Sequence, residues 1–552
     1  MEQQQWVLSS PTLGIIFVGA SFVIFYLIGW YSQKRAKIAT DYWTAGRSIG
    51  AVTNGLGMAS SYMSLATFMG VTALILNLKV PFVYLWIQFS LSIPLITLWY
   101  GAPLRRLGAF TPAQFVRERY GLSTSYITVL FMILVMVMYA LGQMIGVAKV
   151  FEMLFGFNYN ISLICGGALI VGYVTIGGMY GTSYNAAFQM ILMGIAFVVP
   201  LGAIMKGMGG TGWYFPPLLY SDMVPAMLEA VPDFFDMKYG FKWYLALIPC
   251  FTIGAIGLPH LGMRVYTASN LKSARNAMVW FTFFCGIVFS ATYTMGFSGV
   301  FFQATQATAG QGIIPSDFDK ITLILNSVYN PAWVLAFVIA GAIAAGLSTI
   351  SANLMAIGAM IAQDIIATIK PNLPDKTMKV IGYAAIAGGG AASILIALDP
   401  PTFLVVSILW AFGLAGVTVA PAAILGVWWK PANRYGAFTS ILVSGLVYII
   451  VSPYIFPNIT ISTGLQAKIG MSGSLLCVPL SFFLLTTVSM ITERIPSLMM
   501  RIPVEQDKML VDKVHGWSEY SDERYNSTRA GIIIAAVSLF FCIYAVLPGG
   551  WA

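Results

Sequence analysis

Apolar residues in this chain gather in long blocks that short polar stretches separate. Each block runs for roughly 18–25 residues, the length that a helix needs to cross the hydrocarbon core of a membrane. The blocks lack the alternation of apolar and polar residues that is typical of barrel strands. The pattern therefore predicts an all-α polytopic membrane protein with about 14 transmembrane helices. The predicted spans lie near residues 12–30, 51–76, 80–101, 126–150, 161–178, 186–206, 243–260, 276–302, 329–366, 378–398, 402–428, 435–456, 470–492 and 530–548.

Composition narrows the class of protein further. Hydrophobic residues make up 58% of the 552 residues and charged residues only 9%, whereas a soluble domain carries about 25% charged residues. Charged residues are too few to cover a water-facing surface. We therefore expect the lipid bilayer to surround the protein, and we expect no nucleic-acid partner. The five cysteines are scattered through apolar blocks without paired spacing, which predicts neither disulfides nor a metal site.

Basic residues predict how the chain lies in the membrane. Most of the 29 Lys and Arg residues fall on one set of alternate loops, which the positive-inside rule places in the cytoplasm. The other set holds only Lys79, Lys149, Lys206, Lys238, Lys242, Lys320 and Lys468. With an even number of spans, both termini then lie outside. Residues 1–11 lack the basic segment of a cleavable signal, so we expect a multi-pass protein of the bacterial inner membrane.

Ionisable residues avoid the centres of the predicted spans. None of the 20 acidic residues lies there, Asp364 coming closest, and His260 and His515 are expected in cytoplasmic loops. Proton-coupled carriers usually keep an intramembrane acid or histidine, so the sequence favours a coupling ion that neutral oxygens hold, such as sodium. We find no catalytic constellation, which predicts that the protein is not an enzyme. We also expect no buried Arg or Lys that could pair a carboxylate.

Two predicted spans, five apart in the chain, contain residues that interrupt helices. Such a pair in corresponding positions of two halves predicts a binding site near the middle of the membrane. The alternative is packing, because Gly and Ser are common where membrane helices meet. The interrupting residues are Gly55, Gly57, Ser60, Ser61 and Ser64 in the first span, and Pro249, Gly254, Gly257 and Pro259 in the second.

A third span, 329–366, combines small residues with hydroxyl groups. Gly341, Ala345, Ser348 and Ala352 recur at helical spacing, so one face can approach another helix closely. Ser348 and Thr349 place two hydroxyls near the middle of the span. From these residues alone, the hydroxyls either bind an ion or bond back to the carbonyl of residue i−4, which is the commoner use of a helical hydroxyl.

Six motifs, in the same order, make the chain resemble the sodium/solute symporter family. Within that family it most resembles the acetate and short-chain monocarboxylate branch. They are DYWTAGR from Asp41, FTPAQFVRERYG from Phe110, YVTIGGMYG from Tyr173, GLPHLGMRVYTASNLKSAR from Gly257, AAGLSTISANLMAIGAMIAQDI from Ala344 and WWKPANRYGA from Trp428. The resemblance covers nearly the whole chain. The sequence departs from the branch at Ser61, where an Asp is frequent, and in its last span, because the family's commonest pattern has one span fewer.

This resemblance implies a five-plus-five inverted repeat in which helices 2 and 7 are broken. The two halves would cover residues 51–206 and 207–428, with a first helix and loop at 1–50 and peripheral helices at 429–552. The implied sodium ligands are the carbonyls of Ser60, Met63 and Ala345 and the hydroxyls of Ser348 and Thr349. The implied solute positions are Thr67, Trp86, Phe89, Phe251 and Gly254, for whose aromatic residues packing or lipid contact is the alternative.

The expected function is sodium-coupled import of a small solute, with Na⁺ as coupling ion and no other cofactor. The implied pocket is sparse and apolar, which favours a short-chain monocarboxylate such as acetate, whose charge helix-end amides and the bound sodium would meet. An amino acid, a betaine, urea or another neutral or zwitterionic solute is the alternative, as is proton coupling. A membrane-embedded sensor and a passive channel are less favoured, and a small accessory membrane subunit is left open.

Overall fold

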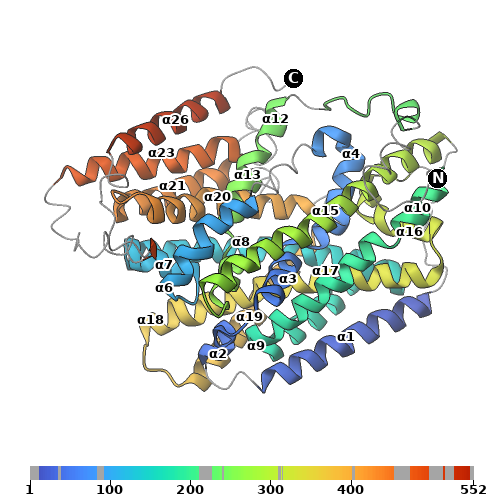
Figure 1. Ribbon diagram of the computed structural model, residues 1–552, viewed down its shortest axis with the longest axis horizontal. Coiled ribbons are helices and arrows are strands. Elements are labelled where there is room, and N and C mark those ends of the chain that lie inside the picture. The colour runs from blue at the N-terminus through green and yellow to red at the C-terminus, as the bar shows by residue number, and fades with distance from the viewer. Residues whose placement is uncertain are drawn as a thin grey trace.

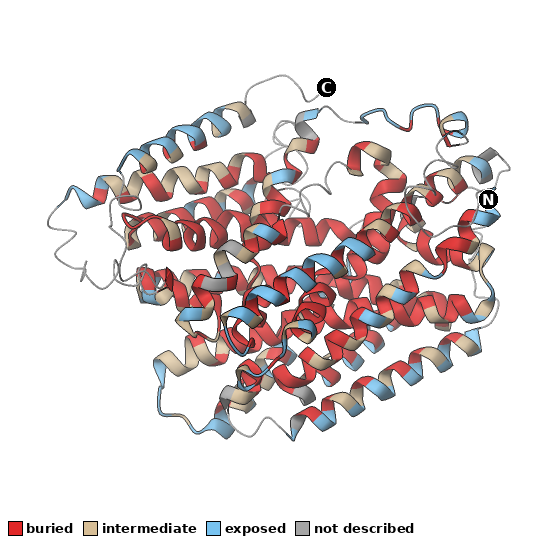
Figure 2. Cartoon of the chain, viewed as in Figure 1, coloured by how far each residue is buried: buried red, intermediate tan, exposed pale blue. Residues whose placement is uncertain are grey.

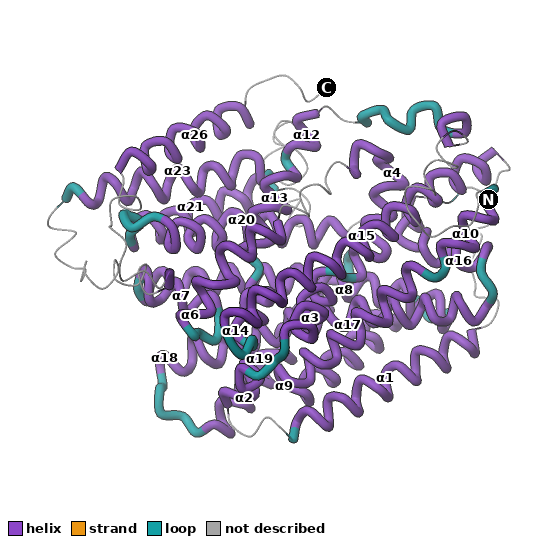
Figure 3. Tube along the Cα trace, viewed as in Figure 1, coloured by secondary structure: helices purple, strands orange, loops and turns teal. Residues whose placement is uncertain are grey.

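The computed structural model describes residues 11–34, 39–83, 92–209, 225, 227–238, 241–308, 313, 315–400, 404–452, 473–495, 514–515 and 528–546. Within these residues the chain forms helices, short loops and an isolated bridge between Ile49 and Ala268 (Figure 3). Ten described helices are long and apolar enough to cross a membrane, and the shorter apolar helices Tyr159–Thr175 and Thr528–Tyr544 are two further candidates. The prediction of an all-helical polytopic membrane protein is therefore confirmed.

The first part of the chain contains the first interrupted span and two long helices. In order, its elements are α1 (Pro11–Gln33), α2 (Ala39–Thr44), η1 (Ala45–Arg47), α3 (Ala51–Tyr62), η2 (Ala66–Gly70), α4 (Val71–Val83), η3 (Thr97–Leu104), α6 (Arg105–Leu107), α7 (Pro112–Tyr120), α8 (Leu122–Phe155), α9 (Tyr159–Val198) and α10 (Leu201–Gly207). The interrupted span consists of α3, η2 and α4.

The second part begins with the second interrupted span, made of α12, α13, η4 and α14. Its elements are α12 (Phe241–Leu245), α13 (Leu247–Gly254), η4 (Ala255–Gly257), α14 (Pro259–Tyr266), α15 (Leu271–Thr308), η5 (Pro315–Lys320), α16 (Ile321–Tyr329), α17 (Ala332–Ala359), η6 (Met360–Ile366), α18 (Ala367–Ile369), α19 (Asp375–Ala397), α20 (Leu404–Trp428), α21 (Arg434–Val451), α23 (Ser474–Glu493) and α26 (Thr528–Val546).

Most predicted spans correspond to one helix each, and the differences have local causes. The predicted spans 161–178 and 186–206 fall mostly in one element, α9, which kinks at Gly178 with a φ of 56° that side chains rarely adopt. The long ninth span is α17 continued through η6 and α18 to Ile369. Residues 84–91 of the predicted third span lie outside the described residues.

Three helices, α8, α17 and α20, form the buried centre of the molecule. Most residues of these helices are buried, and in α20 nearly all of them, as Figure 2 shows by the red ribbon through the middle of the molecule. By contrast, α1 and α26 lie at opposite edges (Figure 1) and expose apolar side chains, including Ile16, Leu27, Ile533 and Phe540. Apolar side chains face outward here because a membrane helix meets lipid rather than water.

Short helices gather at the two ends of the bundle. Figure 1 shows α2, α6, α7 and α18 at one end, and α10 and α16 at the other. At the first end, Arg119 donates to the carbonyls of Gly426 at 3.1 Å and Lys430 at 2.9 Å, which satisfies acceptors at the end of α20. At the other end, Lys149 pairs with the buried Asp319 at 2.6 Å. The first end carries the basic loops that the sequence predicts to be cytoplasmic.

Candidate functional site

The first interrupted span breaks between Tyr62 and Leu65. α3 ends at Tyr62, Met63 leaves helical geometry with a ψ of 88°, and a helix resumes at Leu65. In a continuous helix the Leu65 N–H would bond the carbonyl of Ser61, but here it donates to Oε1 of Gln143 on α8 at 2.9 Å. The break therefore frees carbonyl oxygens at the end of α3 to accept other partners.

Two hydroxyls of α17 reach these freed carbonyls. Ser348 Oγ lies 2.7 Å from the carbonyl oxygen of Ser60, and Thr349 Oγ1 lies 3.1 Å from that of Ser61. Each hydroxyl also lies near the Ala345 carbonyl of its own helix, at 2.9 Å for Ser348 and 3.3 Å for Thr349. Both uses of a hydroxyl that the sequence allows are thus present, and for each residue the shorter contact crosses to α3.

The structure brings four of the five predicted sodium ligands together, namely Ser60, Ala345, Ser348 and Thr349. The fifth, Met63, is buried at the break itself, directly after the end of α3. The carbonyl of Ser61 joins this cluster and was not among the predicted ligands. The cluster is made of neutral oxygens, and the described residues contain no group of three or more His, Cys, Asp or Glu side chains that could hold a metal ion. Such oxygens suit a hard monovalent cation.

Gln143 is a polar residue at the break that the sequence analysis missed, whereas Ser64 was named there as an interrupting residue and has a capping role in the structure. Gln143 is wholly buried on α8, and its Nε2 has no hydrogen-bond partner among the described residues. The Ser64 hydroxyl accepts from the N–H of Ala66 at 3.2 Å and so caps the helix that resumes after the break. A signal for Gln143 is present in the sequence, because it is a lone amide side chain inside an apolar helix of 34 residues.

The second interrupted span breaks at Leu258, which is extended (φ −75°, ψ 112°) between η4 and α14. Before the break, the span lies against the backbone of α20. A Cβ on Gly254 would lie 2.3 Å from the carbonyl oxygen of Phe412, and a Cβ on Gly257 would lie 2.3 Å from that of Ala415. These glycines therefore allow close packing as well as a break. The two interpretations of the sequence, helix packing and an interrupted helix, apply to the same residues.

The predicted solute positions are distributed over several elements. Thr67 is buried in η2, and Phe251 is buried in α13, where its ring packs edge-on against Phe412 with centroids 5.4 Å apart. Gly254 lies against the backbone of the same Phe412. The helix α20 contacts both η2 and α13 and so connects these positions. Trp86 and Phe89 lie outside the described residues.

The burial of three basic residues corrects the sequence analysis. His260 and Arg264 are buried on α14 rather than in a cytoplasmic loop, and His515 is buried as well. Nε of Arg264 donates to Oγ of Ser61 at 2.9 Å. The expectation that no buried Arg is available to pair a carboxylate is therefore wrong. It was wrong because the predicted span ends at residue 260, whereas a buried helix continues beyond the break to Tyr266.

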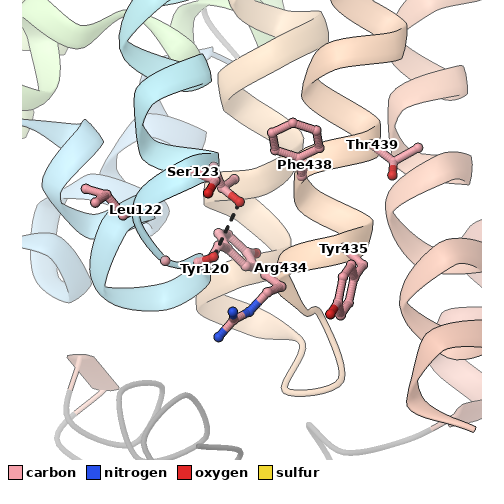
Figure 4. A pocket seen from close by; sticks show the side chains of 9 residues that line it. Tyr120, Leu122, Ser123, Arg434, Tyr435, Phe438 and Thr439 are labelled. Carbon is pink, nitrogen blue, oxygen red and sulfur yellow. Dashed lines mark hydrogen bonds between the residues drawn. The ribbon is translucent and has the colours of Figure 1, made fainter. Parts of the chain in front are cut away.

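A separate cavity of about 510 Å³ lies where the start of α8 faces α21. Figure 4 shows Tyr120 and Leu122 on one side of it and Arg434, Tyr435 and Phe438 on the other. None of the predicted sodium or solute residues lines this cavity. It is therefore distinct from the oxygen cluster between α3 and α17.

Comparisons with known proteins identify the family and the fold of the chain. The sequence model of the sodium:solute symporter family matches residues 42–444. A Na⁺-coupled sialic acid symporter, solved in a substrate-bound outward-open state, is similar with a TM-score of 0.72 and 17% identity, over 87% of this chain and 98% of that chain. The two therefore share a fold.

Other solved transporters are less similar. Mhp1, a nucleobase-cation-symport-1 family transporter, has a TM-score of 0.46 and 14% identity, over 90% of this chain and 98% of that chain. A manganese transporter of Eremococcus coleocola has a TM-score of 0.47 and 11% identity, over 90% and 94%. The family match covers well over half of the sequence, so this chain belongs to the sodium:solute symporter family and is a multi-pass membrane transporter that couples solute movement to sodium, not an enzyme.

Proposed function

We propose that this chain imports a short-chain monocarboxylate such as acetate together with sodium, by alternating access. The observation that carries the ion site is the meeting of freed α3 carbonyls with the hydroxyls of Ser348 and Thr349 on α17. The proposed ligands are the carbonyls of Ser60, Met63 and Ala345 and these two hydroxyls. Because none of them carries a formal charge, partial charges alone would hold the ion in a water-poor interior, where each oxygen counts.

The proposed solute pocket lies where η2 and α13 meet α20. It includes Thr67, Phe251 and Gly254, with Trp86 and Phe89 as further positions. Buried aromatic and small residues favour a short alkyl tail, whereas a polyol would need many convergent hydrogen-bonding groups. A monocarboxylate fits this balance of one charged end and one apolar end.

The proposed topology follows from the same elements. The interrupted spans at α3 and at α13 to α14 would be equivalent helices of a five-plus-five inverted repeat, in residues 51–206 and 207–428. Two peripheral regions, 1–50 and 429–552, complete about 14 spans. The basic loops would face the cytoplasm of a bacterial inner membrane and both termini the outside.

Uptake into proteoliposomes tests this function. The panel contains labelled acetate, propionate and pyruvate, together with proline, glycine betaine and urea. We expect the carboxylates to accumulate only with an inward sodium gradient and regardless of a pH gradient. Sodium-driven uptake of proline, betaine or urea without uptake of carboxylates would replace the proposed solute. Uptake that a proton gradient drives without sodium would overturn the proposed ion site.

A further inference from the structure

Arg264 is a buried cation that has no acidic partner among the described residues. Its side chain is 1% exposed, and none of the ion pairs in the described part of the chain includes it. Nε donates to the neutral hydroxyl of Ser61, and Nη1 makes no hydrogen bond to any described residue. A buried charge is costly unless an opposite charge and hydrogen bonds compensate it, so this guanidinium calls for an anion.

The unused donor of Arg264 lies close to the backbone of α3 and near α9. A Cβ on Gly57 would lie 2.8 Å from Nη1 of Arg264 and 3.7 Å from the carbonyl oxygen of Ser183 on α9. Any residue with a side chain at position 57 would therefore displace the guanidinium. Gly57, Ser183 and Arg264 are all buried, so an anion that reaches this donor must be small.

His260 adds a second group with unused hydrogen-bonding capacity. It precedes Arg264 by one helical turn, so the two side chains share a face of α14. The imidazole is 2% exposed and packs edge-on against Tyr139 with ring centroids 5.4 Å apart, and neither ring nitrogen has a hydrogen-bond partner among the described residues. A guanidinium and an imidazole on the same face of α14 offer the donors that bind a carboxylate well.

We infer that Arg264, assisted by His260, binds the carboxylate of the transported solute on the α14 side of the second break. This inference rests on the proposed function, because it names the group that would recognise a monocarboxylate. The guanidinium presents its donors in a planar fork that matches the two oxygens of a carboxylate. A neutral solute of the same size would leave the buried charge uncompensated, so the position also selects for anions.

Ser61 connects this anion position to the proposed sodium site. Its carbonyl accepts from Thr349 and its hydroxyl accepts from Arg264. A fixed positive charge thus lies beside the place proposed for sodium, and it opposes sodium binding while no anion is present. A bound carboxylate neutralises that charge, so sodium and solute strengthen each other's binding, each by the same factor.

Binding to the purified full-length protein tests this coupling. Thermal stabilisation is measured against sodium concentration with and without acetate, propionate or pyruvate. In the wild type, the carboxylate lowers the sodium midpoint. Arg264→Gln is expected to weaken carboxylate binding roughly tenfold to hundredfold, to bind sodium alone several-fold more tightly, and to lose most of the mutual dependence. A structural role alone would not tighten sodium binding.

A second pair of variants protects the test from a folding defect at Arg264. Ser61→Asp places a carboxylate next to the guanidinium, so it should compete with the solute and make sodium binding independent of it. Ser61→Asn introduces a side chain of the same size without the charge, so the difference between the two variants isolates the effect of the carboxylate. Arg117→Gln, at the end of the bundle on α7, removes a different arginine and should change neither midpoint.

Each outcome decides between the inference and the function on which it rests. If the wild type transports carboxylates but Arg264→Gln and Ser61→Asp bind them with wild-type affinity, the inference is wrong and the proposed function stands. If the wild type transports no carboxylate, the proposed function fails first. A titration with choline chloride that lowers the sodium midpoint as far as acetate does would assign the position to an inorganic anion and overturn the carboxylate assignment.

Discussion

The two interrupted spans break their helices in similar ways but leave opposite chemistry at the break. At the first, the freed groups are carbonyl oxygens of Ser60 and Ser61, which meet the hydroxyls of α17. At the second, the helix that follows the break carries Arg264 and His260, whose free groups include hydrogen-bond donors. A broken helix therefore creates a place for a ligand, and the side chains on either side of the break decide its charge.

This comparison predicts that neutral oxygens alone bind sodium at the first break. Ser348→Ala combined with Thr349→Ala should cause the largest loss of sodium affinity. Loss of one hydrogen-bond-scale contact to a charged group costs about 1.5–3 kcal/mol, so each hydroxyl should account for a roughly tenfold to hundredfold rise in the sodium concentration for half-maximal uptake. Apparent solute affinity at fixed sodium should fall as well, and saturating sodium should restore much of it.

Ser351→Ala provides the matched control on the same helix. The Ser351 hydroxyl is wholly buried and bonds back to the carbonyl of Ser348 at 3.0 Å, without reaching α3. Its removal should leave sodium dependence unchanged. Normal sodium dependence in the double alanine variant would show that both hydroxyls only join α17 to α3 and do not bind sodium, and a proton-driven mechanism would then be the better interpretation.

The second break should instead be sensitive to volume. Gly254→Ala places a Cβ 2.3 Å from a backbone oxygen of α20, and backbone cannot move aside as a flexible side chain can. Overpacking of this kind costs about 1–3 kcal/mol, which should appear as a lower unfolding temperature and slower uptake. Gly286→Ala on α15, where no atom lies within 4 Å of the added carbon, is the control. Equal unfolding temperatures for the two variants would contradict the close approach of α13 and α20.

Thr67→Trp separates the solute from the ion. Thr67 is buried in η2 beyond the first break, so a large ring there should occupy space that the solute needs. We expect about a tenfold loss of apparent solute affinity, the equivalent of 1.4 kcal/mol, while sodium still stabilises the purified protein. Transport kinetics and a solute range identical to those of the wild type would mean that the pocket lies elsewhere.

The sequence and the structure agree where local patterns decide the outcome and differ where distant segments meet. Long apolar blocks predict the helices, and the Ser348–Thr349 pair in a small-residue helix predicts where hydroxyls are presented. The burial of Arg264 could not be predicted, because PHLGMRVY is polar enough to resemble a loop and only the surrounding helices bury it. The hydrogen bond from Leu65 to Gln143 could not be predicted either, because 78 residues separate the two partners in the sequence.

Gln143 allows the smallest and most specific test of the first break. With Gln143→Leu, the N–H of Leu65 loses its acceptor but can turn back to the carbonyl of Ser61 and restore a helical bond. The variant thus exchanges one hydrogen bond for another, so the net cost is about 0.5–1.5 kcal/mol. The exchange withdraws the Ser61 carbonyl from Thr349, so the sodium concentration for half-maximal uptake should rise roughly twofold to tenfold. Gln143→Glu keeps the acceptor and should retain the break. An unchanged sodium dependence in Gln143→Leu, with the protein still folded, would mean that Met63 and Ser64 maintain the interruption without help from α8.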